Sequence, residues 1–283
     1  MPELPEVEVL ARHLRPVLRG KTIRAVHVHR AKILKPTSER ELRRVLTGAK
    51  FKSLARRGKY LLFEFHSVAL RKSITVLGHL GMTGRMFVAE KSEPLPKHAA
   101  VVWELNRGNF VYEDTRYFGR MTLDLSSVTK LGPEPWDKNF TPEFFARELK
   151  RSRQPVKVKL LDQTLVAGVG NIYASEALFR AGISPKRAAN KLTLAQVRAL
   201  HRTVREVLEQ AIAGGSTVQL NFGAGKTDGL FYFGRAVDAT NYYEERLRVY
   251  DRAGKPCLNC DSPIKRIVQA SRSTFYCPHC QKI

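Results

Sequence analysis

The residues of this chain best suited to chemistry include four cysteines near the C-terminus, arranged as two Cys-x2-Cys pairs. Cys257 and Cys260 form the first pair, and Cys277 and Cys280 form the second. Two such pairs at this separation fit a tetrahedral zinc site of four thiolates. Two disulfides or redox-active motifs are the alternatives, but redox motifs usually occur singly beside a βαβ pattern, and nothing indicates an oxidising compartment. The pattern therefore predicts one structural zinc ion and a hairpin between the pairs.

A second candidate for chemistry is the N-terminus, where Pro2, Glu3 and Glu6 follow the initiator methionine. Methionine is normally removed before a small second residue, which would leave the secondary amine of Pro2 at the terminus. An α-amino group has a pKa of about 8, and neighbouring Lys and Arg would lower it further, so free base would be available near neutrality. Such an amine can attack an aldehyde-like sugar carbon and form an iminium ion, with Glu3 as acid/base. Met-Pro starts are common, so the local sequence leaves this open.

The composition narrows the class of partner. Lys and Arg total 49 against 26 Asp and Glu, which gives a formal net charge of +23. Cationic side chains that neutralise phosphates release condensed counterions, so this charge favours a nucleic acid over a merely basic surface. A hydrophobic content of 43% excludes wholesale disorder. No apolar run suits a membrane span and the N-terminus lacks a secretory signal, so we expect a soluble, intracellular protein.

The sequence of the N-terminal part of the chain predicts a helix followed by strands. Apolar residues at spacings of three and four predict a helix over 3–19, which would place Glu3 and Glu6 where the helix dipole favours carboxylates. Structural capping is therefore the alternative to catalysis for these acids. Strands are expected at 22–28, 60–65, 73–77, 100–105 and 109–112. This pattern predicts a β-sandwich or barrel with an N-terminal helix.

Beyond Pro133 and Pro135 the periodicity becomes helical. Thr141 before Pro142 marks a helix start, and a short helix is expected at 171–181. Thr193 and Gln196 form a capping box for a helix that extends to about residue 213. Residues 215–245 are rich in glycine and aromatic residues with weak periodicity, which indicates a long, partly mobile loop.

Seven motifs in order along the chain carry a resemblance to a known family. They are MPELPEVE at the start and the segments 56–62, 78–84, 114–119, 131–136, 168–176 and 274–280. Together they resemble the bacterial formamidopyrimidine-DNA glycosylases, the Fpg or MutM family of base-excision repair. The leucine in MPELPE resembles the residue at this position in the formamidopyrimidine-DNA glycosylase branch rather than the one in the endonuclease VIII branch.

The resemblance implies an α+β fold in three parts. These are an N-terminal catalytic β-sandwich with flanking helices (1–132), a helix–two-turn–helix DNA-binding domain with a lesion-capping loop (133–245) and a β-hairpin zinc finger (246–283). Zinc would be the only cofactor, and duplex DNA with a damaged base would be the partner. A monomeric, cytoplasmic, nucleoid-associated bacterial enzyme with no membrane contact is expected.

The resemblance also implies a bifunctional reaction. The enzyme would flip an oxidised purine out of the duplex, displace it by attack of Pro2 on C1′, and nick the strand by β,δ-elimination through a Schiff base. Glu3 would be the acid/base, and Glu6 a second acid that orders the site. Lys59 would serve β-elimination and a phosphate contact, and Arg272 would grip the phosphates and serve δ-elimination.

Further positions match the family's DNA contacts. Three side chains would fill the space that the flipped base leaves, and five more would lie close to the DNA backbone: Met82, Arg116 and Phe118, then His79, His98, Arg153, Lys157 and Asn171. Arg116 would read the orphaned cytosine. Asn171 opens a helix whose N–H groups suit a phosphate.

Taken singly, several of these residues have a structural interpretation. Met82 and Phe118 could be core residues, and Lys59 could be a solvated lysine at a strand edge. His98 could be a surface histidine, and Arg272 could balance the negative charge of the zinc-site thiolates.

The chain departs from the family pattern at Tyr117, where a second basic residue is expected, and in the longer segment 215–245. The second departure bears on lesion preference. Two other functions therefore stay in view. One is an endonuclease VIII-like enzyme for oxidised pyrimidines, and the other is a non-catalytic zinc protein that binds damaged DNA.

Overall fold

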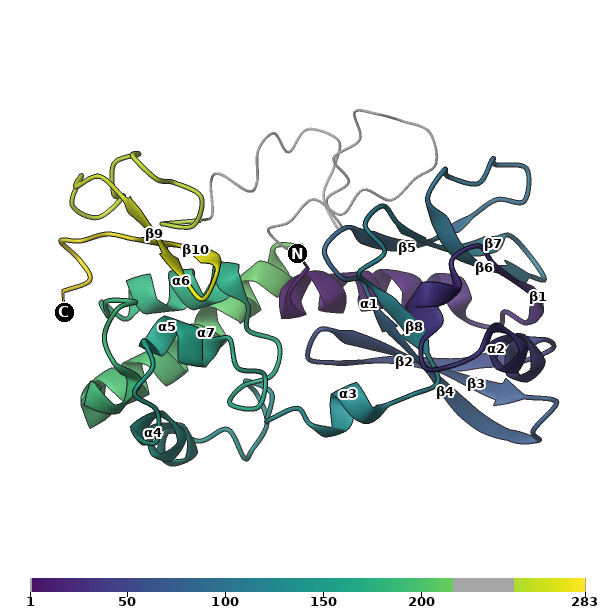
Figure 1. The fold of residues 1–283 in the computed structure, drawn as a ribbon, viewed down its shortest axis with the longest axis horizontal. Helices are drawn as coiled ribbons and strands as arrows, with labels where there is room; N and C mark the ends of the chain where they lie inside the picture. Colours follow the sequence, from purple (N-terminus) through teal and green to yellow (C-terminus); the bar gives the residue numbers. More distant parts are fainter. Residues whose placement is uncertain (1, 216–246, 283) are drawn as a thin grey trace. The chain divides into compact units, whose positions relative to one another are not determined.

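The computed structural model describes residues 2–215 and 247–282 of the chain. These residues form two compact units (Figure 1). The first unit contains Pro2 and Glu6–Thr129, and the second contains Glu3–Pro5 together with 130–215 and 247–282. The N-terminal helix α1 (Leu4–Leu18) therefore begins in residues of the second unit.

The first unit is built on two four-stranded antiparallel sheets, which correspond to the sandwich rather than the barrel of the sequence prediction. One sheet has the order β1-β6-β7-β5 and the other the order β2-β3-β4-β8. The elements after α1 are β1 (Ile23–Val28), η1 (Ala31–Leu34), α2 (Glu39–Leu46), β2 (Lys50–Arg57), β3 (Tyr60–Ser67), β4 (Lys72–His79), β5 (Gly84–Ala89), β6 (Ala99–Leu105), β7 (Asn109–Asp114), β8 (Arg120–Thr122) and α3 (Ser126–Thr129).

Aromatic side chains from both sheets meet in the core of this unit. The ring of Phe63 on β3 lies edge-on to Trp103 and Phe110 of the other sheet, at 5.3 and 5.5 Å between centroids. Such edge-to-face pairs add to the burial of large apolar area. Helix α1 contributes Leu10 and Leu14, both fully buried, to the same core.

All five expected strands are present, but the sequence pattern missed the strands β2, β5 and β8 and the helices η1, α2 and α3. The case of β2 shows why. Its sequence is strongly basic, and only Phe51 and Leu54 are buried. The strand forms because it pairs along its whole length with β3, which local propensity does not reveal. The β3–β4 register then places Tyr60 opposite His79, so Lys59, which precedes Tyr60, lies at the same end of these two strands as His79.

The second unit is helical and ends in a β-hairpin. Its elements are α4 (Pro142–Lys150), α5 (Val156–Leu160), α6 (Asn171–Arg180), η2 (Ala189–Lys191), α7 (Leu194–Ala213), β9 (Lys265–Gln269) and β10 (Arg272–Tyr276). The expected Thr141 cap and the Thr193–Gln196 capping box are both present. Helix α6 packs against α7 and against β10.

The fold class is therefore the expected α+β arrangement. Nearly all of the predicted loop over 215–245 lies outside the described residues. Within the described ranges, no helix is both long and apolar enough to cross a lipid bilayer.

Candidate active site and zinc centre

The four cysteines form a compact cluster at the base of the β9–β10 hairpin. Their sulfur atoms all lie within 4.8 Å of one another. The Sγ–Sγ distances are 3.5 Å for Cys260–Cys277, 3.9 Å for Cys257–Cys280 and 3.4 Å for Cys260–Cys280. A tetrahedron of zinc–sulfur bonds has edges of roughly 3.8 Å. The thiolates thus fit one structural zinc ion, and His279 is exposed, as expected for a residue that is not a ligand.

The hairpin above this cluster presents Arg272. Ala270 and Ser271 form its turn with φ values of 47° and 60°, and Arg272 opens β10 opposite Gln269. The Arg272 side chain is exposed. Its charge contributes to lowering the pKa of Lys157, so it lies near that lysine. A two-residue turn of left-handed residues fixes the hairpin register and hence the place of this arginine.

Glu3 is a capping acid, but it caps a helix remote in sequence rather than its own. Its side chain is 1% exposed. Its Oε1 accepts from the backbone N–H of Ile172 at 2.9 Å, and its Oε2 accepts from that of Tyr173 at 3.4 Å. The N-cap residue of α6 is Gly170, which offers no side-chain acceptor. A Cβ at Gly170 would lie 2.3 Å from the Glu3 carboxyl carbon, so only glycine allows this approach.

Pro2, Glu6 and Lys59 are the other expected catalytic residues, and all belong to the first unit. Pro2 is buried, Glu6 is fully buried and Lys59 is 8% exposed. Lys59 follows Gly58, whose φ of 57° makes the tight turn between β2 and β3. Since Lys59 is buried, its interpretation as a solvated strand-edge lysine is wrong.

Lys157 and Asn171 form a buried polar junction. Lys157 is fully buried, and its Nζ donates to Thr274 Oγ1 at 2.8 Å, to the Ser273 carbonyl at 3.3 Å and to Asn171 Oδ1. Asn171 Nδ2 donates to the same Ser273 carbonyl at 2.9 Å. Burial lowers the pKa of Lys157 to about 8, while the charge of Glu3 opposes that shift. In this structure both side chains tie the hairpin to the start of α6, and the helix N–H groups expected to suit a phosphate bind Glu3 instead.

Met82 and Phe118 are exposed rather than buried, at 44% and 51%. Their interpretation as core residues is therefore wrong. Arg116 is also exposed, and its guanidinium carbon lies 4.7 Å from the centre of the Phe118 ring.

His79 lies against the turn that carries Met82. Burial, reinforced by the charges of Lys59 and Arg120, lowers the pKa of His79 to about 4. Its Nδ1 accepts from the backbone N–H of Gly81 at 3.2 Å, which suits a neutral ring.

His98 and Arg153 are the remaining predicted contacts of the DNA backbone. His98 is partly exposed and its Nδ1 lies 3.4 Å from the hydroxyl of Tyr117, and Arg153 is exposed. Tyr117, the departure from the family pattern, has a φ of 53°, and the Arg30 guanidinium carbon lies 5.2 Å from the centre of its ring. A cation therefore stands beside the position where a basic residue is expected.

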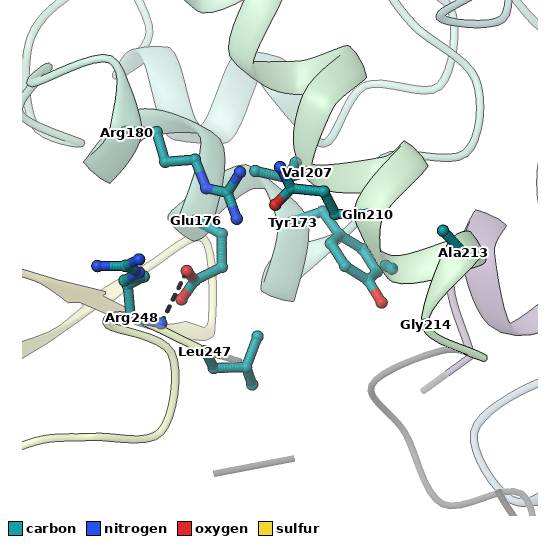
Figure 2. Close-up of a pocket in the computed structure, with 10 residues that line it drawn as sticks. Tyr173, Glu176, Arg180, Val207, Gln210, Ala213, Gly214, Leu247 and Arg248 are labelled. Atoms are coloured by element: carbon teal, nitrogen blue, oxygen red, sulfur yellow. Dashed lines mark hydrogen bonds between the residues drawn. The ribbon is translucent and has the colours of Figure 1, made fainter. Parts of the chain in front are cut away.

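Sequence reasoning missed Glu176, which lies at the wall of a pocket in the second unit. Its carboxylate accepts from the backbone N–H groups of Arg248, Val249 and Tyr250, each at 2.9 Å. Figure 2 shows the carboxylate directed at the Arg248 backbone. Burial raises the pKa of Glu176. The pocket, of about 440 Å³, is lined by Tyr173, Glu176, Arg180, Val207, Gln210, Ala211, Ala213, Gly214, Leu247 and Arg248. A signal was available, because Glu176 is an acidic residue at the end of the family-like segment 168–176, among mostly buried residues of α6.

A β-sandwich, a helical unit and a four-cysteine hairpin together define a zinc-finger protein of the DNA-repair glycosylase class. Three family models match in order: the formamidopyrimidine-DNA glycosylase N-terminal domain over 1–121, its H2TH domain over 131–221, and a zinc finger found in FPG and IleRS over 254–283. The chain belongs to the formamidopyrimidine-DNA glycosylase family, and it is an enzyme of that class.

Relatives and solved structures agree with this assignment along the whole chain. A formamidopyrimidine-DNA glycosylase of Bacillus licheniformis is 40% identical, and one of Paracoccus denitrificans is 41% identical, each over 100% of both chains. A point mutant of the Lactococcus lactis FPG, solved with Fapy-dG containing DNA, covers 100% of both chains with a TM-score of 0.87 and 32% identity. A MutM structure with carbocyclic 8-oxo-G containing DNA gives a TM-score of 0.86, with 32% identity over 100% of both chains.

Proposed function

We propose that this enzyme excises formamidopyrimidines and 8-oxoguanine from duplex DNA and then nicks the abasic site by β,δ-elimination. The observation that carries the proposal is the Glu3 carboxylate, which follows Pro2 in the chain and is held by two backbone N–H groups of α6. A carboxylate fixed in this way is oriented before the substrate arrives, which general acid–base catalysis requires. Relatives solved with Fapy-dG and 8-oxo-G DNA support the choice of lesion.

The proposed chemistry begins with the secondary amine of Pro2. Its lone pair attacks C1′ of the damaged nucleotide, the C1′–N bond to the base breaks, and the base leaves with a proton. Glu3 exchanges protons with the sugar as the ring opens to the iminium ion. Removal of a C2′ proton then expels the 3′ phosphate, and a second elimination expels the 5′ phosphate. No water is consumed in the eliminations, and hydrolysis of the iminium frees the amine.

The other residues of the proposed site act on phosphates and on the duplex. Lys59 and Arg272 hold the phosphates that become leaving groups. Met82, Arg116 and Phe118 fill the space of the extruded base. We also propose the domain limits 1–132, 133–245 and 246–283, zinc as the only cofactor, a monomeric state and a nucleoid location in the bacterial cytoplasm.

Borohydride trapping tests the lyase step. Wild-type enzyme with an 8-oxoguanine:cytosine duplex should give a covalent complex, and mass spectrometry should locate the link at Pro2. A form in which an extra residue blocks the Pro2 amine is the matched control and should bind the duplex without trapping. Wild-type protein that binds this DNA but never traps would refute the proposed chemistry.

Two alternatives make different predictions. An enzyme for oxidised pyrimidines is supported by the Lactococcus lactis enzyme solved with oxidised pyrimidine containing DNA. It would turn over a thymine glycol duplex faster than an 8-oxoguanine:cytosine duplex, so a paired assay decides. A non-catalytic zinc protein would bind damaged DNA without cutting it, whether or not the Pro2 amine is free.

A further inference from the structure

We propose that Asp114 and Thr83 form a clamp that fixes the exposed side chains Met82, Arg116 and Phe118 relative to one another. Asp114 and Thr83 are positioning residues, since neither needs to touch DNA. This inference rests on the proposed function, in which the three exposed side chains fill the space of the extruded base.

One buried carboxylate joins the two loops that carry these side chains. Asp114 is fully buried at the end of β7. Its Oδ1 accepts from Thr83 Oγ1 at 2.6 Å and from the Arg116 backbone N–H at 3.2 Å. Its Oδ2 accepts from the Gly119 backbone N–H at 2.8 Å. Donors from 80–84 and from 115–119 therefore converge on a single side chain, and bonds to a carboxylate are about twice as strong as neutral ones.

Thr83 reinforces the link from the other loop. Its hydroxyl donates to Asp114 and accepts from the Arg116 backbone N–H at 3.3 Å. Thr83 is the neighbour of Met82, so this hydroxyl connects the residue beside one exposed side chain to the backbone of another. The hydroxyl thus ties Met82 to the backbone that carries Arg116.

The two loops also touch through their backbones. Gly81 has a φ of 63°, and a Cβ there would lie 2.6 Å from Gly119 N and 2.8 Å from Phe118 C. Tyr112, two residues before Asp114 on the same face of β7, donates its hydroxyl to the His79 carbonyl at 2.9 Å. The first loop is thus held at its start by Tyr112 and at its end by Thr83. Neither loop can slide past the other without breaking these contacts.

The function of such a clamp is preorganisation. Side chains that enter a base stack must be in place at the moment of extrusion, and ordering a loose loop at that moment would reduce the binding free energy. Tyr117 adopts a left-handed φ of 53° between Arg116 and Phe118, a conformation that persists only where its surroundings determine it. The bonds from Asp114 to residues 116 and 119 bracket that residue and supply the constraint.

The test compares two duplexes that differ opposite the lesion. The first carries 8-oxoguanine opposite cytosine, and the second carries it opposite a tetrahydrofuran abasic analogue, which offers no base for Arg116 to hold. Thr83→Val keeps the shape of the side chain and removes the hydroxyl, while Thr83→Ser restores it. Thr47→Val is the matched control, because the Thr47 hydroxyl donates to the Arg43 carbonyl on α2 and, among the described residues, makes no hydrogen bond to either loop.

For Thr83→Val we expect kcat/KM to fall roughly tenfold on the cytosine duplex and clearly less on the abasic-opposite duplex. Thr83→Ser should recover most of the loss, and Thr47→Val should match the wild type on both duplexes. Asp114→Asn should show the same duplex dependence with a larger loss, because its amide places N–H donors against a backbone N–H.

The outcomes separate the clamp from the function on which it rests. Wild-type protein that fails to excise from either duplex contradicts the proposed function. If the wild type is active and Thr83→Val is as active as the wild type, the clamp is refuted. It is also refuted if Thr83→Val loses the same activity on both duplexes. A drop in melting temperature with an equal loss on both duplexes shows a merely structural role and also refutes it.

Discussion

Gly170→Ala should separate the position of Glu3 from the stability of the fold. The added Cβ would lie 2.3 Å from the Glu3 carboxyl carbon and 2.4 and 2.6 Å from its oxygens. These atoms are the far end of a flexible side chain, so Glu3 can rotate away without a backbone shift. Gly170 has φ −130° and ψ −158°, an extended conformation that alanine adopts without strain. The fold should survive while the carboxylate loses its place.

The magnitude follows from what Glu3 does at the start of α6. Losing the bonds from Ile172 and Tyr173 removes the N-terminal cap of that helix, which costs about 1 kcal/mol of stability and lowers Tm by roughly 2–4 °C. The effect on catalysis should be much larger. A positioned acid/base contributes about 10²–10⁴ in rate, so we expect base excision to slow by about 100-fold or more.

Two single-turnover assays measure this effect. One follows excision of 8-oxoguanine, and the other follows borohydride trapping on a duplex with a preformed abasic site. The second should change little, because the base is already gone and the sugar already opens to an aldehyde. Glu3→Gln combined with Gly170→Ala should be no slower than Glu3→Gln alone, since both changes act on one group. A folded Gly170→Ala protein that excises at the wild-type rate would refute the reasoning.

Three further predictions follow from the same structure. Chelation of zinc, or Cys277→Ser, should unfold residues 247–282 and abolish DNA binding, because metal supplies the folding free energy of such small modules; hydrogen exchange over that segment checks it, and persistent protection would contradict it. The pKa of His79 is lowered to about 4 in the folded state. The folded protein therefore keeps the full contribution of neutral His79 to its stability above the unfolded-state pKa of about 6.5, and it loses that contribution as the pH falls towards 4. The loss should amount to about 3 kcal/mol, and urea unfolding of His79→Gln should lack it; an unchanged pH profile would exclude it. Arg272→Ala should reduce the slope of log affinity against log salt by about 0.9 if Arg272 neutralises one phosphate, and an identical slope would remove it from the interface.

The features predictable from the sequence were those set by local pattern. The capping box at Thr193 needs only side chains three residues apart, and the structure contains it. The cysteine pairs imply their own geometry, because two Cys-x2-Cys turns leave few arrangements besides a tetrahedron. Strand β2 was missed because its apolar content is low and its formation depends on pairing with β3.

The exposure of individual side chains was harder to predict than their presence. Met82 and Phe118 are residue types that are usually buried in a core, yet both side chains are exposed. Each lies in a loop that other residues hold in place, as the hydrogen bond from the Gly119 backbone N–H to Asp114 does beside Phe118. Lys59 suits a solvated strand edge by residue type, yet its side chain is only 8% exposed. Residue type gives a preference for burial, and only the packing of neighbouring elements decides the outcome.

Glu3 and Glu176 show most clearly which contacts cannot be predicted from the sequence, because both bind backbone groups that are far away along the chain. Glu3 binds N–H groups 169 and 170 residues away, and Glu176 binds N–H groups 72 to 74 residues away. A backbone N–H is the same for almost every residue type, so the sequence does not show which backbone groups these two carboxylates bind. Both carboxylates act at α6: Glu3 holds its first turn, while Glu176, from its interior, holds the chain that leads into the zinc module. A substitution at either residue should therefore perturb the helix that presents Asn171, and pairing it with a change at Asn171 should give a non-additive loss of DNA affinity.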